Sequence, residues 1–279
     1  MLQPTTLHQE EALIAFVHIN KCGGTSVSEV LELCDLPPSR FADNEGVGGL
    51  HHHTLRAYAQ MNPTRNVSFL SFAVVRDPYA RMVSLFYYQL SGCGGPWRSE
   101  RLLAGYGHCD DMPSQSDLPS KSELRANASA MVPYFQSWIH RLDARNPTGS
   151  ASAPFFTGMA PSGKEGPRRD ASETAWLEDE AGQVPHGLVL LTLNETLDTQ
   201  WRQFTQTALP QCAGVELTHE KSSGSHYVSA TEHFEGDGGV AASILEAHVA
   251  RDFGPPLRFS RLAQQRVRSR VDVGFWWEK

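Results

Sequence analysis

IAFVHINKCGGTS, the stretch at residues 14–26, joins a short apolar run to a glycine-rich turn. The first six residues are mostly apolar and partly β-branched, which predicts a buried strand with His18 as a core residue. Four apolar residues then recur at helical spacing, namely Val27, Val30, Leu31 and Cys34. This spacing predicts a helix directly after the turn, with Thr25 or Ser26 as its N-cap.

The same order of strand and helix recurs further along the chain. Residues 69–75 and 188–193 are apolar runs that predict two more strands. The helix expected after the later strand buries Trp201 and Phe204, and another helix is expected at residues 240–253. Strands that alternate with helices favour an α/β fold with a central, mainly parallel sheet flanked by helices.

The chain has 279 residues, which is compatible with one large domain or two small ones. We expect a single domain over residues 1–279. Two stretches rich in Gly, Pro or Ser interrupt the strand–helix pattern, at residues 91–122 and 143–186. They predict loop insertions.

Charge, hydropathy and cysteine content argue against several classes of protein for this chain. The net charge of −7 disfavours a nucleic-acid partner, which usually calls for a basic excess. No run approaches the roughly 18 apolar residues that span a bilayer, so no membrane segment is expected in this chain. The five cysteines contain no CxxC pair, which disfavours a zinc site. One disulfide between Cys93 and Cys109 and five reduced thiols are the two alternatives.

The turn at residues 21–26 has the chemistry of an anion-binding loop. Backbone N–H groups and the helix dipole at a helix start attract phosphate or sulfate. Gly23 and Gly24 permit close approach of the backbone, and Lys21 adds a positive charge. In a Walker A loop the lysine follows the glycines, whereas Lys21 precedes them, which disfavours an ordinary nucleoside-triphosphate hydrolase. A purely structural turn is the alternative.

A second motif, RDPYARMVS, follows the expected strand at residues 69–75. Arg76 at the strand end and Ser84 two turns into the next helix are spaced to reach one anion, and arginine binds phosphate in a bidentate manner. A local ion pair between Arg76 and Asp77 is the alternative. Two anion sites on two strand–helix units predict a ligand with two separated phosphate-like groups.

Both motifs resemble those of a known family. Residues 16–26 resemble the 5′-phosphosulfate loop of the carbohydrate sulfotransferases, and residues 75–84 resemble their 3′-phosphate motif. The resemblance is greatest to the heparan/uronyl 2-O-sulfotransferase branch. It implies a P-loop-like three-layer fold and the donor 3′-phosphoadenosine 5′-phosphosulfate (PAPS), with 3′,5′-adenosine bisphosphate (PAP) as product. The chain departs from the family at Asn20 and Cys22, where relatives more often have Pro and either Thr or Ala.

The resemblance also implies which residues bind the cofactor. Those implied at the phosphosulfate are Lys21, Cys22, Gly23, Gly24, Thr25 and Ser26. Arg76 and Ser84 are implied at the 3′-phosphate. A loop similar to one that covers the nucleotide in relatives begins at Lys221 and Ser222.

Three consecutive histidines, His51, His52 and His53, lie between the two motifs. Sulfuryl transfer to a hydroxyl needs a base, and histidine, with a pKa of about 6.5, suits that role. The register of the resemblance favours His52 as the base. His51 or His53 is the alternative, as is a surface cluster without a catalytic role. Alternate residues of an extended segment face opposite ways, so the three do not converge on a metal, and none is expected.

These observations predict a PAPS-dependent sulfotransferase that acts on a hydroxyl by in-line displacement, with Lys21 and the loop amides neutralising the leaving group. The family implies a glycan acceptor, while the acidic net charge also fits a small hydroxylated acceptor. The alternatives are a non-catalytic module that binds PAP or a nucleotide, and a P-loop-type kinase. The compartment is either the cytoplasm or, for a domain without its anchor, the Golgi lumen, and the oligomeric state is open.

Overall fold

The computed structural model describes residues 13–41, 53–61, 69–92, 112–120, 122–123, 127–145, 173–217, 230–235 and 237–248. Contacts divide the chain into two compact units. The first comprises residues 1–75, 173–220 and 260–279, and the second comprises residues 76–172 and 221–259. Each unit has its own buried apolar core. That the whole chain works as one domain stays a prediction.

The first unit is built on a parallel sheet. Its strands are β1 (Leu13–Val17), β2 (Phe69–Val75) and β3 (Val189–Thr192), in the order β1-β2-β3. Phe16 lies opposite Phe72, which in turn lies opposite Val189. Successive residues of β1 are buried, and since they point to opposite faces, both faces of the sheet are covered.

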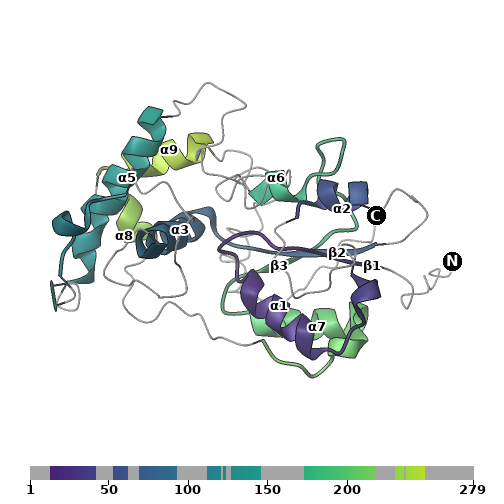
Figure 1. The fold of residues 1–279 in the computed structure, drawn as a ribbon. Helices are drawn as coiled ribbons and strands as arrows, with labels where there is room; N and C mark the ends of the chain where they lie inside the picture. The colour runs from purple at the N-terminus through teal and green to yellow at the C-terminus, as the bar shows by residue number, and fades with distance from the viewer. Residues whose placement is uncertain are drawn as a thin grey trace, which may run out of the picture. The chain divides into compact units, whose positions relative to one another are not determined.

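Helices cover the two faces of this sheet (Figure 1). The helices α1 (Gly24–Leu33) and α7 (Leu197–Ala208) lie on one face, and α2 (Leu55–Met61) and α6 (Glu173–Leu177) lie on the other. Trp201 and Phe204 pack on Phe72 of the central strand, with ring centroids 6.4 and 4.7 Å away. The layers confirm the predicted α/β class, and the burial of Trp201 and Phe204 confirms their prediction as core residues.

A disulfide between Cys34 and Cys212 closes this unit. Cys34 is the C-cap of α1, and Cys212 belongs to the short 3-10 turn η7 (Pro210–Cys212) after α7. The alternative of five reduced thiols is therefore wrong, while Cys93 and Cys109, the other pair considered, lie outside the described residues. No local pattern indicates this pairing, because 178 residues separate the two cysteines along the chain.

The second unit is helical in the part that the structure describes. It contains α3 (Pro78–Gly92), α5 (Val132–Arg145), α8 (Ala230–Glu235) and α9 (Val240–His248), with the short turns η4 (Gln115–Asp117) and η5 (Ala128–Met131). Phe86 and Trp138 lie around Phe135 in its core, with centroids 5.5 and 5.8 Å from that ring. The helix expected at residues 240–253 is confirmed as far as residue 248.

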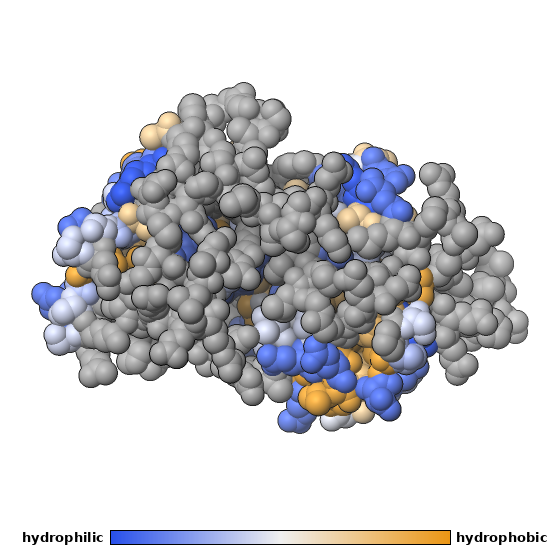
Figure 2. All heavy atoms as spheres, viewed as in Figure 1, coloured by the Kyte–Doolittle hydropathy of each residue, from blue (hydrophilic) through white to orange (hydrophobic). Residues whose placement is uncertain are grey.

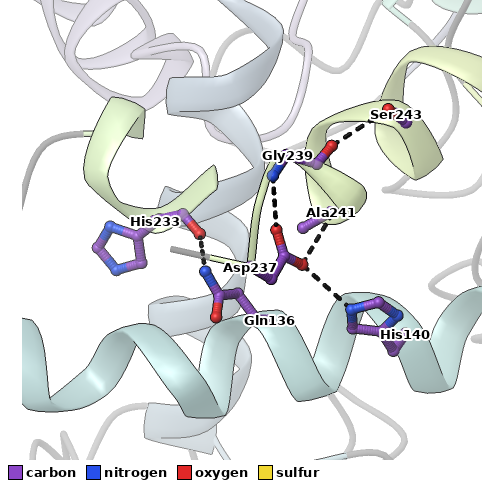
Figure 3. Close-up of polar contacts among 7 residues, drawn as sticks. All are labelled: Gln136, His140, His233, Asp237, Gly239, Ala241 and Ser243. Carbon is purple, nitrogen blue, oxygen red and sulfur yellow. Dashed lines mark hydrogen bonds and ion pairs between the residues drawn. The ribbon is translucent and has the colours of Figure 1, made fainter. Parts of the chain in front are cut away.

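The side chain of Asp237 connects the start of α9 to α5 through hydrogen bonds (Figure 3). Its carboxylate accepts hydrogen bonds from the amides of Gly239, at 3.2 Å, and Ala241, at 2.9 Å. The same carboxylate lies 3.1 Å from Nε2 of His140 on α5. One acidic side chain therefore caps a helix and joins it to its neighbour.

The predicted insertion at residues 143–186 differs from the structure at both ends. It begins inside α5 and includes α6, whose Trp176 and Leu177 are fully buried. The apolar residues of this short helix are too few to show a helical period, so the composition of the surrounding stretch dominated the prediction.

The surface over α1 and α7 shows hydrophobic and hydrophilic residues side by side (Figure 2). The exposed large apolar side chains among the described residues are Leu33, Phe69 and Val240. None of the described helices has the length and hydropathy that crossing a bilayer requires.

Candidate functional site

The turn between β1 and α1 is tight. The amide of Ile19 donates to the carbonyl of Val17 at 3.0 Å, and the amide of Cys22 donates to the carbonyl of Ile19 at 3.3 Å. Lys21 has a φ of 66° and Gly23 a φ of 78°, both in the left-handed region. The chain therefore reverses direction within a few residues, and Lys21 adopts a conformation that side chains other than Gly, Asn and Asp rarely take.

Gly23 is the N-cap of α1, which corrects the expected cap at Thr25 or Ser26. The helix begins at Gly24, so Thr25 and Ser26 lie in its first turn. Gly23 adopts the positive φ that lets the helix start so early, and it has no side chain with which to cap the first-turn amides. Thr25 and Ser26 are half-buried and belong to the turn whose amides have no side-chain cap.

Gly24 lies directly against His18. A Cβ atom at Gly24 would be 2.0 Å from Cδ2 of the imidazole, so only glycine fits. The His18 ring is 6% exposed and stacks on Phe16, with centroids 5.7 Å apart. The prediction of His18 as a core residue is confirmed, and its ring supports the first residue of the helix.

Cys22 points away from solvent and contacts a residue from a distant part of the chain. Its thiol is 0% exposed and donates to Oε1 of Glu173 at 3.2 Å. The thiol also approaches the carbonyl oxygen of Asn20 at 3.8 Å. Glu173 is the first residue of α6 and is 1% exposed. Sequence analysis missed Glu173, because it lies in the stretch predicted as an insertion.

The second motif starts α3 as expected. Pro78 is the first residue of the helix, and the Asp77 carboxylate accepts the amide of Ala80 at 2.9 Å, as an N-cap does. Arg76, which directly follows β2 in the sequence, is half-buried, as is Ser84 in α3. Both belong to the second unit, whereas the loop belongs to the first. Their shared binding of one ligand with the loop stays a prediction.

Of the three consecutive histidines, the structure describes His53. This residue is buried, and its ring meets Tyr58 edge-on with centroids 5.4 Å apart. The Tyr58 hydroxyl donates to the carbonyl of Phe16 in β1 at 2.9 Å. His53 therefore lies in the packed layer that contains α2.

Several predicted residues lie outside the described part of the chain, namely His51, His52, Lys221 and Ser222. Among the residues that the structure describes, no group of three or more His, Cys, Asp or Glu side chains is arranged to hold a metal ion.

Comparison with known proteins places the chain in a family. The model of the Sulfotransferase family matches residues 4–160, more than half of the chain. The match includes the loop, the three histidines and the second motif. Searches of curated proteins and of solved structures returned no match. With its parallel sheet and glycine-rich turn, the chain belongs to the sulfotransferase family.

Proposed function

We propose that the protein transfers a sulfuryl group from PAPS to a hydroxyl of a glycan or a small hydroxylated acceptor. The observation that carries this proposal is the start of α1, where a glycine N-cap with positive φ leaves the first turn without a capping side chain. Such a helix start attracts an anionic group through its amides and its dipole. The family match supports sulfuryl transfer as the reaction.

The residues of the loop fit the phosphosulfate end of PAPS. Cys22 and Gly24 are buried, whereas Lys21, Thr25 and Ser26 retain exposed surface. One turn therefore contains a cationic residue and two hydroxyl residues with exposed surface, next to the first amides of α1. PAPS, when bound, supplies the sulfuryl group and an adenosine bisphosphate leaving group. Lys21 and the amides neutralise negative charge there, in the way that positioning and electrostatics support phosphoryl transfer.

Arg76 and Ser84 are proposed to hold the 3′-phosphate, and the segment beginning at Lys221 and Ser222 to cover the nucleotide. An arginine that directly follows a strand, beside a helix start capped by Asp77, fits this role. The family model matches residues 4–160 and therefore includes residues of both units, which supports one catalytic domain.

His52 is proposed to take the proton from the acceptor hydroxyl. The buried position of His53 against Tyr58 favours a neighbouring histidine as the group that meets the acceptor. Replacing His52 with Ala is expected to abolish turnover and to leave PAP affinity unchanged. Replacing His53 with Ala is expected to lower the melting temperature. Sulfuryl transfer to a panel of glycans and phenols, with melting curves of each variant, separates these roles.

The acceptor is proposed to lie against the stretches at residues 91–122 and 143–186, because variable loops on a rigid scaffold commonly form such sites. The net charge of −7 favours a neutral or lightly charged acceptor over a polyanionic chain. A transfer assay with neutral, singly charged and highly sulfated glycans as acceptors tests this preference.

The cofactor is tested by calorimetric titration of the full chain with PAP, with ADP and ATP as controls. We expect binding that needs both the 3′- and the 5′-phosphate and falls more than tenfold in Lys21→Ala and in Arg76→Ala. Arg56→Ala is the matched control, because Arg56 is an exposed cation that donates to the carbonyl of Asp179. Equal binding of PAP and ADP would refute the proposed cofactor and favour a generic nucleotide site.

A non-catalytic PAP-binding module is the second candidate, and the histidines distinguish it from an enzyme. Such a module binds PAP in the same way but transfers nothing to any acceptor. Its biological function would survive the replacement of His51, His52 and His53. A P-loop-type kinase would instead bind ATP at least as tightly as PAP.

A further inference from the structure

Glu173 is a buried acidic residue in direct contact with the anion-binding loop. Its side chain is 1% exposed, and burial of a carboxyl group is unfavourable unless hydrogen bonds compensate for the lost water. Its Oε1 accepts the thiol hydrogen of Cys22, a residue 151 positions earlier in the chain. Because the two residues are so far apart in the sequence, local folding alone does not account for this buried polar contact.

We propose that Glu173 is a positioning residue that holds the loop in its anion-binding conformation through the side chain of Cys22. The inference rests on the proposed function, since it concerns the affinity of the loop for PAP. With 1% exposure Glu173 acts on the ligand through the loop, so it is not a catalytic residue.

The conformation of the loop explains why an anchor at Cys22 matters. Cys22 stands between Lys21 and Gly23, whose φ values of 66° and 78° are both left-handed. Lysine populates that region sparsely, so the surrounding structure has to maintain it. The Cys22 amide donates to the carbonyl of Ile19 in a long hydrogen bond of 3.3 Å. The thiol contact to Glu173 adds a side-chain anchor at the same residue.

The contact with Cys22 requires the hydrogen-bond acceptor of Glu173 and does not require its negative charge. A thiol is a weak donor and requires an acceptor, which a glutamine side chain also supplies through its amide oxygen. Removing a negative charge near an anion site does not weaken anion binding. Glu173→Gln should therefore bind PAP within about threefold of the unchanged protein or more tightly, whereas Glu173→Ala should lose at least tenfold.

A double-mutant cycle on the full chain tests whether the two residues act together. PAP dissociation constants are measured for Cys22→Ala, Glu173→Ala and the double variant. We expect each single variant to lose about tenfold and the double variant to lose no more than either. Independent, multiplicative losses would overturn the proposal, as would equal losses in Glu173→Gln and Glu173→Ala.

Glu178→Ala is the matched control, because Glu178 is also buried and lies directly after α6. It should alter the melting temperature without changing PAP affinity. If Glu178→Ala weakens PAP binding as much as Glu173→Ala, the effect is a general loss of stability and the proposal fails. Cys22→Ser, which retains a donor, should recover part of the affinity that Cys22→Ala loses.

A cofactor-free measurement separates this inference from the proposed function. Amide hydrogen exchange of the peptide that contains residues 20–24 is compared between the unchanged protein, Glu173→Gln and Glu173→Ala. Faster exchange confined to this peptide in Glu173→Ala supports the positioning role even if the unchanged protein does not bind PAP, a result that would refute only the proposed cofactor. Unchanged exchange in Glu173→Ala overturns the positioning role whatever the protein binds.

Discussion

Replacing Gly24 with Ala tests the packing that supports the glycine-rich loop. A Cβ atom at this position would lie 2.0 Å from Cδ2, 2.3 Å from Nε2 and 2.8 Å from Cγ of His18. The ring has little room to move, because it is 6% exposed and stacks on Phe16. The alanine therefore forces either the imidazole or the start of α1 out of its place.

The expected loss of stability follows from two opposing contributions. Overpacking a filled core costs about 1–3 kcal/mol. The higher helix propensity of alanine restores at most about 1 kcal/mol at this position. We expect a net loss of about 1–2 kcal/mol, which raises the unfolded-to-folded ratio by roughly tenfold.

Urea denaturation followed by fluorescence measures this loss as a lower midpoint at constant slope. Gly187→Ala is the matched control, since nothing lies within 4 Å of a Cβ atom there and its φ is outside the left-handed region. The control should be as stable as the unchanged protein or slightly more stable. Combining Gly24→Ala with His18→Ala should cost less than the sum of the two single changes, because the smaller side chain makes room. If Gly24→Ala is as stable as the control, the close contact between His18 and α1 is refuted.

Three further predictions concern other contacts of the described residues. Breaking the disulfide, by Cys34→Ser, by Cys212→Ser or with dithiothreitol, should lower the free energy of unfolding by up to about 5 kcal/mol, the chain-entropy value for a loop of this length. Equal urea midpoints with and without reductant would contradict the disulfide. Asp237→Ala removes the cap of α9 and should cost about 1 kcal/mol, with faster amide exchange at the start of that helix and not in α7. The Ser120 hydroxyl and then its backbone amide lower the pKa of Glu123 below its usual value of 4.5. This contact is therefore intact above pH 4.5 and is lost as the pH falls through the lowered pKa. In Ser120→Ala, which keeps the backbone amide, an NMR titration should show the pKa of the Glu123 carboxyl rising part of the way toward its usual value.

The sequence alone predicted the local parts of this protein well. Each of the three strands, the helix after Gly24 and the helix beginning at Pro78 follows from residues that are neighbours along the chain. The pattern of apolar residues and the glycine and proline positions encode such elements directly, because backbone geometry and side-chain periodicity are local properties. Parallel pairing also followed, since strands joined through helices run in the same direction.

The sequence indicates a chemistry for the candidate site but does not indicate which residues support it. Residues 21–26 contain a lysine, two glycines and two hydroxyl residues, a composition typical of an anion-binding turn. The N-cap of α1 at Gly23, by contrast, depends on a positive φ that the turn imposes. Gly23, Thr25 and Ser26 are all residue types that can cap a helix, and the sequence does not indicate which of them does so.

Contacts between distant residues required the folded chain. The disulfide joins Cys34 to Cys212 across 178 residues, and the thiol of Cys22 meets Glu173 across 151. Neither pairing can be predicted from the sequence near its residues, because those neighbouring residues would allow many other partners. Such pairs form only when the sheet brings the end of β1 beside helices from the later part of the chain. The sequence therefore specified the glycine-rich turn and its composition, and the packing of the sheet and its helices decided which distant residues contact that turn.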